Sequence, residues 1–389
     1  MGSAIRPVSV AERRARLAVR HHLREKAGTV ADAVTGIIAL HGTDPASVYL
    51  SAQARTRDAG IPAIERALYD EGALVRMLAM RRTVFVVPAD LVPVIQAACT
   101  DQIAERLRRQ LTKVVREAGI AADAEAWLRE VGDGTVRALA DHGPVTGAEL
   151  ARHEPRLRTQ IIAAEDNPYG GAVNLTTRLL TVLSAEGLMV RGRPRGGWTS
   201  MQFTWSAAER AELPAAGARA DLARRWLFAF GPAPISDLQW WTGWTAAQTR
   251  QAVAQLDTIE VDLDGTAGLM LTADETPDQA QPGWAALLPA LDPTPMGWRD
   301  RSWFAGEHAP ALFDRSGNIG PTIWWDGRIV GGWAQRPDGE IAVRLLEDTG
   351  AEAETAIAAE ARRLGSWLGP ARIIPRFRTP LERELAGQR

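Results

Sequence analysis

A structural unit that recurs along the chain constrains its fold more than any other feature of the sequence. The unit is a helix, a tight turn, a second helix and a two-stranded hairpin, and three copies can be traced. Two copies share the run Glu-Gly-x-[Leu/Met]-Val-Arg where a helix ends, at 71–76 and 186–191. Two share Gly-Pro before a short helix, at 143–150 and 231–238. This arrangement is typical of the winged-helix module, whose second helix or wing usually contacts duplex DNA.

The repeat and the turn signals together predict an α+β fold of three tandem winged-helix modules and a small C-terminal β-sheet or barrel domain. The expected boundaries are the N-terminal helices with the first module (1–89), a helical connector (90–130), the second module (131–207), the third module (208–274) and the β-rich domain (283–389). A length of 389 residues agrees with this, because it favours two to four domains.

Short apolar runs separated by turn signals predict the strands of the C-terminal domain. The runs cover 285–291, 318–325, 328–334 and 340–345. Asp-Gly pairs at 326–327 and 338–339 suit hairpin turns between them. We expect a helix over 350–368 and a last strand near 371–377 to complete the domain.

The distribution of charge bears on nucleic-acid binding. The formal net charge is only −2, but basic residues cluster at 76–82, 106–116, 191–195 and 372–378. Lys26 and Lys113 are the only lysines among 45 basic residues, and arginine suits bidentate phosphate contacts. Genomic drift toward GC-rich codons would produce the same bias. The hairpin of the third module is acidic between 257 and 264, so we expect that module to be mainly scaffold.

The composition excludes several other classes of protein. No stretch approaches the roughly 20 uncharged apolar residues of a membrane span. Residues 1–25 are rich in Arg and His and lack the apolar segment of a secretory signal. Cys99 is the only cysteine, which excludes an intramolecular disulfide and a zinc site built on cysteines, and the histidines lack metal-ligand spacing. These features favour a cytoplasmic protein that does not contact a membrane.

Several stretches, taken in order, carry a resemblance to a known family. They are Leu-His-Gly-Thr-Asp-Pro at 40–45, Met-Arg-Arg-Thr-Val-Phe at 80–85, Arg-Gly-Arg-Pro-Arg-Gly-Gly-Trp at 191–198, the pair of runs 287–293 and 296–301, and 323–333. Their order along nearly the whole chain resembles that of the AlkZ/YcaQ-type bacterial DNA glycosylases. The resemblance implies a C-shaped scaffold of three winged-helix units with a C-terminal β domain. It also implies hydrolysis of the N-glycosidic bond of alkylated purines, typically N7-alkylguanine, unhooking of interstrand crosslinks by some members, and no metal or organic cofactor.

The resemblance places catalysis in the turn after the first apolar helix. The family pattern there is Gln-x-Gln or Gln-x-Asp, whereas this sequence has His41 and Thr43 at those positions. N7 alkylation makes guanine a good leaving group, so the main task is to position a water near the anomeric carbon, and neutral side chains can do this. We hypothesise that His41 orients or deprotonates the water, that Thr43 holds it, and that Asp44 orients the imidazole or offsets positive charge on the sugar.

Each of these residues also has a structural interpretation. Asp44 precedes Pro45 and is a good N-cap for the next helix. Thr43 can serve in the same way, and His41 can be a polar turn residue whose ring nitrogens are satisfied locally.

Basic side chains on the wings and the connector are the candidate DNA contacts. The candidates are Arg81 and Arg82 in the first wing, Arg191, Arg193 and Arg195 in the second, and Arg109 and Lys113 on the connector helix. A cationic hairpin tip suits insertion into a groove or contact with flanking phosphates. The alternatives are a solvated turn for the second wing, a surface ion pair for the first, and a solvated helix face for the connector.

The sequence therefore predicts a monomeric, monofunctional DNA glycosylase whose partner is double-stranded DNA with alkylated purines. No lysine nucleophile is evident near the expected cleft, so a lyase step is not expected. The alternative is a non-catalytic winged-helix DNA-binding protein, either a lesion binder or a transcriptional regulator. A regulator usually dimerises to read two half-sites, and no heptad pattern or long dimerisation helix is evident.

Overall fold

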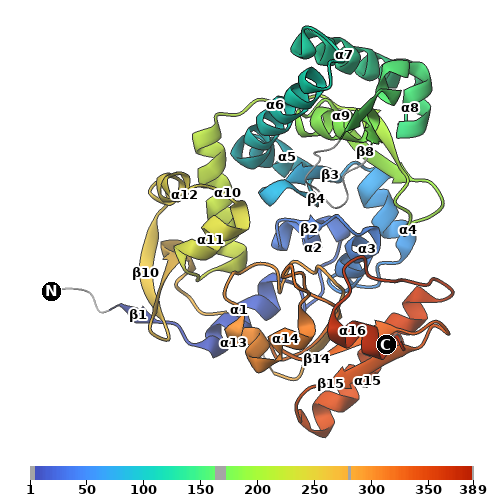
Figure 1. The fold of residues 1–389 in the computed structure, drawn as a ribbon. Coiled ribbons are helices and arrows are strands. Elements are labelled where there is room, and N and C mark those ends of the chain that lie inside the picture. The colour runs from blue at the N-terminus through green and yellow to red at the C-terminus, as the bar shows by residue number, and fades with distance from the viewer. Residues whose placement is uncertain (1–4, 163–171, 279–281, 388–389) are drawn as a thin grey trace.

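A connectivity of helix, strand, helix, helix and hairpin occurs twice in the computed structural model, which describes residues 5–162, 172–278 and 282–387, and a third unit has the strand reduced to a single bridge (Figure 1). The first unit consists of α2 (Val30–Gly36), β2 (Leu40–His41), α3 (Pro45–Gln53), α4 (Ile61–Glu65), β3 (Leu74–Ala79) and β4 (Thr83–Pro88). Its sheet has the order β2-β4-β3, so the short first strand pairs with the last strand of the hairpin. That pairing fixes the turn between β2 and α3.

The second unit repeats this strand order. It consists of α7 (Ala124–His142), β5 (Val145–Thr146), α8 (Gly147–His153), the pair β6 (Gln160–Ile162) and β7 (Ala172–Asn174), α9 (Leu175–Ala185), β8 (Met189–Pro194) and β9 (Phe203–Ala207). Its sheet runs β5-β9-β8. The predicted Gly-Pro helix start is present, and a capping box between Thr146 and Glu149 begins α8.

The third unit replaces the first strand by a single bridge. It consists of α10 (Ala215–Phe230), α11 (Ile235–Thr242), α12 (Ala246–Val253), β10 (Thr258–Leu263) and β11 (Thr266–Leu271). Ala233 bridges Leu269 of β11 in the position that β2 and β5 occupy in the other units.

The repeated Glu-Gly run has a local physical cause. Gly72 and Gly187 have φ angles of +64° and +76°, the left-handed conformation that glycine adopts without penalty. Each lies between the end of a helix and the first strand of a hairpin, so each stops the helix and turns the chain into the sheet. The sequence motif therefore marks a helix C-terminus in both units.

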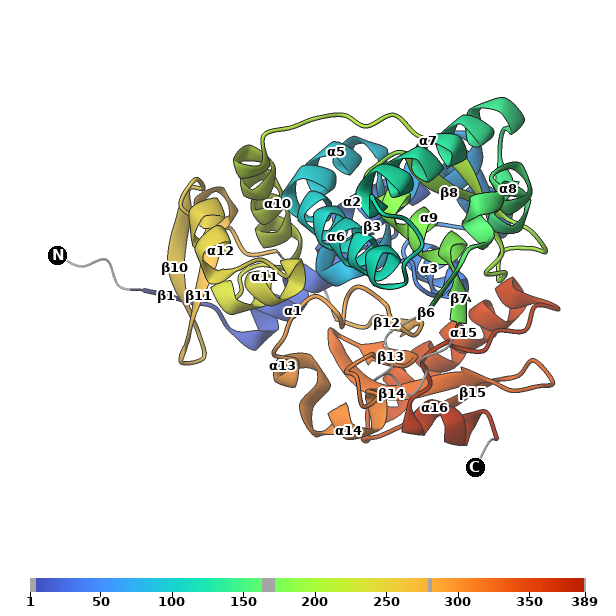
Figure 2. The same cartoon turned by 45° about the horizontal axis from the view of Figure 1, so that its top comes forward.

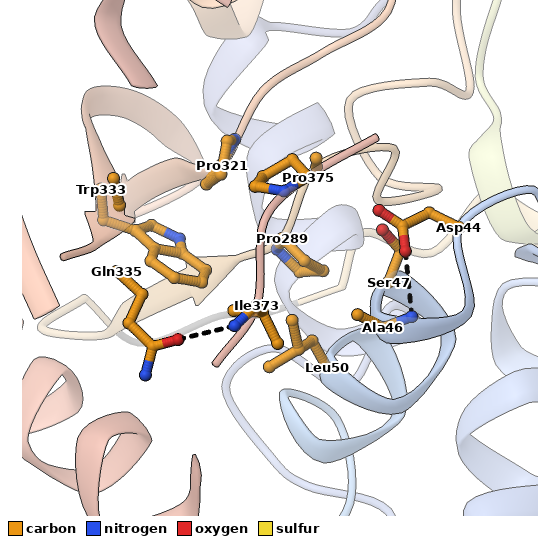
Figure 3. A pocket seen from close by; sticks show the side chains of 12 residues that line it. Asp44, Ala46, Ser47, Leu50, Pro289, Pro321, Trp333, Gln335, Ile373 and Pro375 are labelled. Carbon is orange, nitrogen blue, oxygen red and sulfur yellow. Dashed lines mark hydrogen bonds between the residues drawn. The ribbon is translucent and has the colours of Figure 1, made fainter. Parts of the chain in front are cut away.

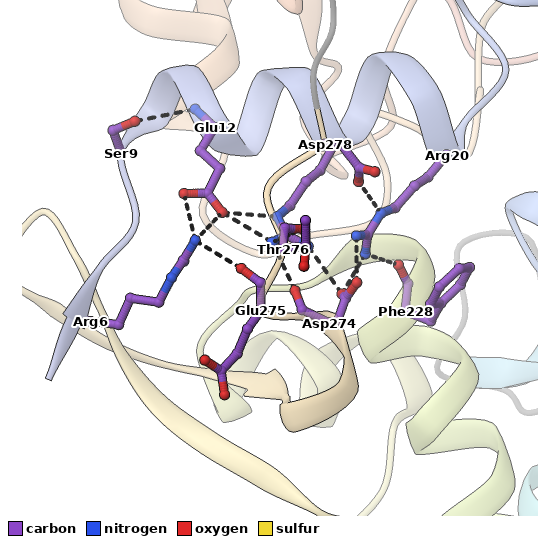
Figure 4. A network of polar contacts seen from close by, with 10 residues as sticks. Arg6, Ser9, Glu12, Arg20, Phe228, Asp274, Glu275, Thr276 and Asp278 are labelled. Atoms are coloured by element: carbon purple, nitrogen blue, oxygen red, sulfur yellow. Dashed lines mark hydrogen bonds and ion pairs between the residues drawn. The ribbon is translucent and has the colours of Figure 1, made fainter. Parts of the chain in front are cut away.

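The N-terminal segment packs on the third unit. Strand β1 (Arg6–Pro7) pairs in parallel with β10, and α1 (Val10–Arg20) lies against α10. Figure 4 shows the polar network that fastens the segment: Arg20 donates to Asp274, Asp278 and the Phe228 carbonyl, with N···O distances of 2.5–2.7 Å. The segment is therefore held against the third unit by strand pairing, packing and ion pairs.

The connector is a run of helical turns ending in a long helix. A short α5 (Val92–Ile95) and further helical turns lead into α6 (Asp101–Glu117), which packs on α9. Arg108 forms a bidentate ion pair with Glu186, the acidic residue of the second Glu-Gly run, at 2.5 and 2.8 Å. The connector thus joins the first unit to the second through both packing and charge.

The C-terminal domain is an open antiparallel sheet with helices against it. Its elements are β12 (Ala285–Leu288), α13 (Ser302–Ala305), α14 (Ala309–Leu312), β13 (Thr322–Trp325), β14 (Arg328–Gln335), β15 (Ile341–Leu345), α15 (Gly350–Leu368) and α16 (Pro380–Leu385). The strands are ordered β12-β13-β14-β15, and both Asp-Gly turns occur where the sequence predicted them. The strand predicted near 371–377 does not form. Side chains hold this segment instead, since Gln335 accepts the Ile373 amide and Asp44 accepts the Arg376 amide.

The hydrophobic clusters show which units share a common core. One large cluster joins residues of the first unit, the connector, the third unit and the C-terminal domain, whereas the second unit has a cluster of its own. Figure 1 shows the second unit above the first, with β8 beside β3, and Figure 2 shows the same units turned by 45°. Among the described helices, none is long and apolar enough to cross a membrane.

Candidate active site

A pocket of about 430 Å³ opens where the first unit, the third unit and the C-terminal domain meet. Its lining comprises His41, Arg81 and Thr83 from the first unit, Trp240 from α11, and Met296, Arg299, Arg301, Ser316, Gly317 and Asn318 from the C-terminal domain. Because its walls come from regions far apart in the sequence, the pocket exists only in the assembled fold.

His41 lies at the end of β2 and faces this pocket. Its strand position pairs with Phe85 of β4, whose ring centroid is 5.3 Å from the imidazole, and only 9% of the residue is exposed. Burial, and secondarily the charge of Arg81, lower the pKa of His41 to about 4. The imidazole is therefore neutral at pH 7, and its Nδ1 is buried without a hydrogen-bond partner. A neutral imidazole is able both to donate and to accept a hydrogen bond.

Arg81 reaches the pocket from a strained position at the tip of the β3–β4 hairpin. Its φ angle is +52°, and its guanidinium stacks over Trp240 at 4.0 Å from the ring centroid. Gly243, just beyond α11, leaves room for this side chain, since a Cβ there would lie 3.2 Å from Arg81 Cγ. The left-handed conformation, which is rare for a β-substituted residue, thus aims a cation at the pocket.

Arg301 faces Arg81 from the C-terminal domain. It stacks over Phe313 at 4.3 Å and over Trp240 at 5.4 Å, and it donates to the carbonyl of Gly317 at 3.1 Å. Burial and the charge of Arg81 lower the pKa of Arg301 to about 10, so both side chains remain cationic at pH 7.

The pocket carries an unbalanced positive charge. None of the described residues that line it is acidic, and in the described ranges Arg81, Arg299 and Arg301 form no ion pair. Three unpaired guanidinium groups beside a neutral imidazole form a site that attracts an anion. Sequence reasoning missed Arg299, Arg301 and Trp240 as site residues, although Arg299 and Arg301 fall inside the matching run 296–301.

Thr43 and Asp44 follow His41 but do not line its pocket. Thr43 is half-buried in the bend before α3. Asp44 is the N-cap of α3: one carboxylate oxygen accepts the Ala46 amide at 3.0 Å and the other accepts the Arg376 amide at 3.0 Å. Figure 3 shows Asp44 at the edge of a separate cavity of about 20 Å³ between α3 and the C-terminal domain. Its carboxylate is thus engaged by backbone amides, as the capping interpretation expected.

Arg82 is directed away from the His41 pocket. It is exposed, has a φ angle of +61°, and lines a different pocket of about 310 Å³ between the first hairpin, α6 and α9. The two adjacent arginines of the β3–β4 hairpin therefore line different pockets.

Replacing Arg82 by glycine is expected to stabilise the fold while weakening DNA binding. Glycine removes the penalty of the left-handed conformation, so the free energy of unfolding should rise by about 0.5–1 kcal/mol. Loss of one exposed cation should lower the affinity for an unmodified duplex about fivefold. The control is Arg82→Ala, which removes the same charge but keeps the strain, measured by urea denaturation and fluorescence anisotropy. Equal stability of the two variants would contradict the assigned strain.

Ion pairs hold the β8–β9 hairpin of the second unit. Arg193 forms ion pairs with Glu65 at 2.6 Å and Asp70 at 2.8 Å, both from the first unit. Arg195 pairs with Glu149 of α8 at 2.9 Å. Both arginines, proposed from the sequence as DNA contacts, thus already hold carboxylate partners, and Arg193 joins two units.

Three further candidate DNA contacts occupy different environments. Arg191 is half-buried, and its guanidinium lies over the rings of Phe203 and Trp205, at 5.7 and 5.2 Å from their centroids. Arg109 and Lys113 are exposed on α6 and make loose pairs with carboxylates one turn away, at 3.8 and 3.6 Å. Such exposed pairs contribute little to stability, so these two cations stay free to meet a polyanion.

The described part of the chain brings together no group of three or more His, Cys, Asp or Glu side chains suited to a metal ion. The single cysteine, Cys99, is buried, and burial raises the pKa of its thiol to about 12. Neither feature offers a metal centre or a reactive thiol at the pocket.

Comparisons with known proteins agree with this architecture. A family model described as "DNA glycosylase AlkZ-like" matches residues 34–367. The "Interstrand DNA cross-link repair glycosylase" of Streptomyces sahachiroi is 27% identical over 256 residues, which cover 60% of this chain and 66% of that relative, just under two thirds of its length. The solved structure of Streptomyces sahachiroi DNA glycosylase AlkZ superposes with a TM-score of 0.70 at 20% identity, over 92% of this chain and 97% of that one. At this identity the structural likeness establishes the fold.

Proposed function

Because the chain belongs to the AlkZ-like DNA glycosylase family, we propose that it hydrolyses the N-glycosidic bond of N7-alkylpurines in duplex DNA, including bulky adducts and interstrand crosslinks. The name of the Streptomyces relative, a crosslink repair glycosylase, supports the choice of substrate. The observation that carries the proposal is the neutral His41 in a pocket lined by three unpaired arginines.

The chemistry matches the side chains at the pocket. An N7-alkylated guanine is cationic, so it leaves without protonation by the protein. The remaining tasks are to hold a water at the anomeric carbon and to bind the phosphates beside the lesion. His41 supplies the first function as a neutral imidazole that orients the water or accepts its proton. Arg81, Arg299 and Arg301 supply the second as phosphate ligands.

The turn after β2 provides the remaining roles. Thr43, which lies in the bend after His41 and outside the lining of the pocket, is proposed to hold the water through its hydroxyl. Asp44 is proposed as a positioning residue that holds the turn by capping α3 and binding the Arg376 amide. Among the described lining residues there is no lysine, which supports a monofunctional reaction without a covalent Schiff base.

The repeated units are proposed to act as winged-helix modules that form a C-shaped cradle for the duplex. The common strand order of the first two units and the equivalent bridge in the third support this. The acidic hairpin of the third unit faces the N-terminal segment through β1, which supports a scaffold role for that unit. We further propose a monomeric, cytoplasmic protein that needs no metal or organic cofactor.

The direct test uses defined lesions. Duplexes carrying a single N7-methylguanine or a nitrogen-mustard crosslink are incubated with the protein, heated in alkali and resolved on denaturing gels. Strand breaks at the lesion, and loss of the crosslinked species, are the expected result. Tight binding without release of any alkylated base would overturn the proposal in favour of a non-catalytic DNA-binding protein.

A further inference from the structure

The arginines that end the two Glu-Gly runs meet at the junction of the first and second units. Arg76 lies in β3 and Arg191 in β8, at the same position of the repeated motif, and these two strands pack against each other. Both guanidinium groups lie over one ring, that of Phe203, at 4.7 and 5.7 Å from its centroid. The repeat thus places two equivalent cations side by side.

The carboxylates of Glu65 and Asp70 at this junction are both engaged by Arg193. In the ranges that the structure describes, neither Arg76 nor Arg191 forms an ion pair, and the same holds for the neighbouring Arg376. Burial and the charges of Arg76 and Arg376 lower the pKa of Arg191 to about 10. Like charges have therefore been gathered here, which is unfavourable unless an anion joins them.

Of Arg76, Arg191 and Arg376, Arg76 is buried and has donors without a partner. Only 3% of it is exposed, and Nη1 donates to the Gly42 carbonyl at 2.5 Å. Its Nε and Nη2 are buried and meet no hydrogen-bond acceptor in proper geometry, although the Tyr69 hydroxyl lies nearby. Buried donors on a cation are normally satisfied, so these two point to a ligand that accepts hydrogen bonds.

A pocket at the junction provides room for that ligand. It has a volume of about 310 Å³, and its lining includes Arg76, Arg191, Arg193, Thr204, Ser206 and Asp70, whose carboxylate is paired with Arg193. The Thr204 hydroxyl donates to the Arg193 carbonyl, so the Ser206 hydroxyl accompanies the guanidinium groups, a combination that suits the tetrahedral oxygens of a phosphate. Because Arg193 pins the hairpin to Glu65 and Asp70, the pocket is held in shape by ion pairs across the junction.

We propose that this junction is a phosphate-binding subsite, formed by Arg76 and Arg191, which takes a backbone phosphate of the DNA strand. The assignment to DNA rests on the proposed function, whereas phosphate binding itself does not. The subsite is connected to the reaction centre, since Arg76 donates to Gly42, which lies between His41 and Thr43. A phosphate bound there would hold the strand next to the catalytic turn and neutralise the buried charge.

Arg191→Gln is the variant of choice, because Arg191 is half-buried and its neutralisation relieves repulsion with Arg76, whereas a change at Arg76 would disturb the core. The control is Arg250→Gln, which removes the same charge from an exposed arginine that has no ion pair in the described ranges and lies on α12 of the third unit. Both variants and the wild type are titrated with inorganic phosphate at constant ionic strength, with chloride as the reference salt. The melting temperature is followed by scanning calorimetry.

Phosphate at ten times its dissociation constant is expected to raise the melting temperature of the wild type and of Arg250→Gln by about 1–2 °C, with saturation. The rise should be absent in Arg191→Gln, whose melting temperature without phosphate should equal or exceed that of the wild type. If phosphate did not raise the melting temperature of the wild type with saturation, the proposed subsite would be wrong. The unpaired donors would then bind water and not phosphate. A rise that persists in Arg191→Gln would overturn the residue assignment.

A second arm identifies the source of the phosphate group. Affinity for an unmodified duplex is measured across a salt series, without any requirement for base excision. Arg191→Gln is expected to bind the duplex about tenfold more weakly than the wild type. The slope of the logarithm of its affinity against the logarithm of the salt concentration should be smaller by about one, whereas Arg250→Gln should match the wild type in both quantities. Unchanged duplex affinity would overturn the assignment to DNA and leave a site for the free ion. If the protein proved not to excise alkylated bases, the expected results of the phosphate titration and of the duplex-binding measurement would be unchanged.

Discussion

His41→Ala is expected to lower the rate of excision of N7-methylguanine by about 10²–10⁴-fold, the range that a positioned acid–base group contributes. Duplex affinity should stay within about twofold of the wild type, because the arginines around the pocket supply the phosphate contacts. Single-turnover kinetics with protein in excess separates the two quantities. A rate within about threefold of the wild type would show that the water is held elsewhere, and the proposed role of His41 would be wrong.

The matched variant His41→Gln separates orientation from proton transfer. An amide donates and accepts hydrogen bonds but does not take a proton at neutral pH. If His41 only orients the water, this variant should retain activity within about tenfold of the wild type, in line with the glutamine of the family pattern. A loss as large as that of His41→Ala would assign proton acceptance to the imidazole.

The pH profile gives an independent signature of the same residue. The pKa of His41 is lowered to about 4, so the imidazole is neutral from pH 8 down to about pH 5. The excision rate should therefore be flat over that range and decline only as the pH approaches 4, whereas an ordinary histidine would cause a decline below about 6.5. Folding must be checked in parallel. A histidine buried in the neutral form lowers stability as the pH falls below 6.5, since the unfolded chain then takes up the proton.

The parts of the fold that follow from local chemistry were predictable from the sequence. Helix ends marked by glycine, Asp-Gly hairpin turns and the N-cap at Asp44 each depend on backbone conformations that a few neighbouring residues decide. The strand predicted near 371–377 does not form, because this segment depends on distant residues and not on its own sequence. Its amides are taken by Gln335 and Asp44, which lie far away in the sequence.

The candidate site was predictable only where one segment carries it. The turn containing His41 was identified from its own motif, but its pocket depends on Trp240 and Arg301, which the packing of the third unit and the C-terminal domain bring to it. Arg193 illustrates the same dependence on distant residues. Its local pattern indicated a free cation at a hairpin tip, but its ion-pair partners Glu65 and Asp70 lie more than a hundred residues earlier in the sequence. Ion-pair partners of this kind leave no periodic signal in a sequence.

Asp292→Ala is expected to reduce the free energy of unfolding by about 3–5 kcal/mol, the effect of removing one partner from a buried ion pair. Arg55 and Asp292 are both fully buried, at 0% side-chain exposure, and form a bidentate pair at 2.6 and 2.8 Å. The carboxylate also accepts the Ser51 hydroxyl at 2.8 Å and the Thr294 amide at 2.9 Å. Its removal leaves a buried guanidinium and two further donors without their acceptor.

The measurement is urea denaturation followed by tryptophan fluorescence, with Glu384→Ala as the control. Glu384 pairs with Arg344 at the same distance of 2.6 Å, but both side chains are exposed, so its loss should change stability by no more than about 1 kcal/mol. The double variant Arg55→Met with Asp292→Leu removes both charges and should recover much of the loss. Equal effects of Asp292→Ala and Glu384→Ala would contradict the role assigned to burial.

The network around Asp292 also determines how the active-site pocket is assembled. Arg55 donates to the Thr294 hydroxyl at 2.6 Å, and that hydroxyl contacts His21 Nδ1 at 2.9 Å. His21 Nε2 lies 3.0 Å from the Ala229 carbonyl, and burial lowers the pKa of His21 to about 3. The ring is therefore neutral, with its proton on Nε2, because a carbonyl only accepts. The chain of bonds joins the segment after α3, the loop after β12, the end of α1 and the end of α10. The first, second and fourth of these lie near His41, Arg301 and Trp240 in the sequence, so they help to bring those residues to one pocket. Asp292→Ala should accordingly reduce excision as well as stability, at a temperature where the variant remains folded, whereas Glu384→Ala should leave both unchanged.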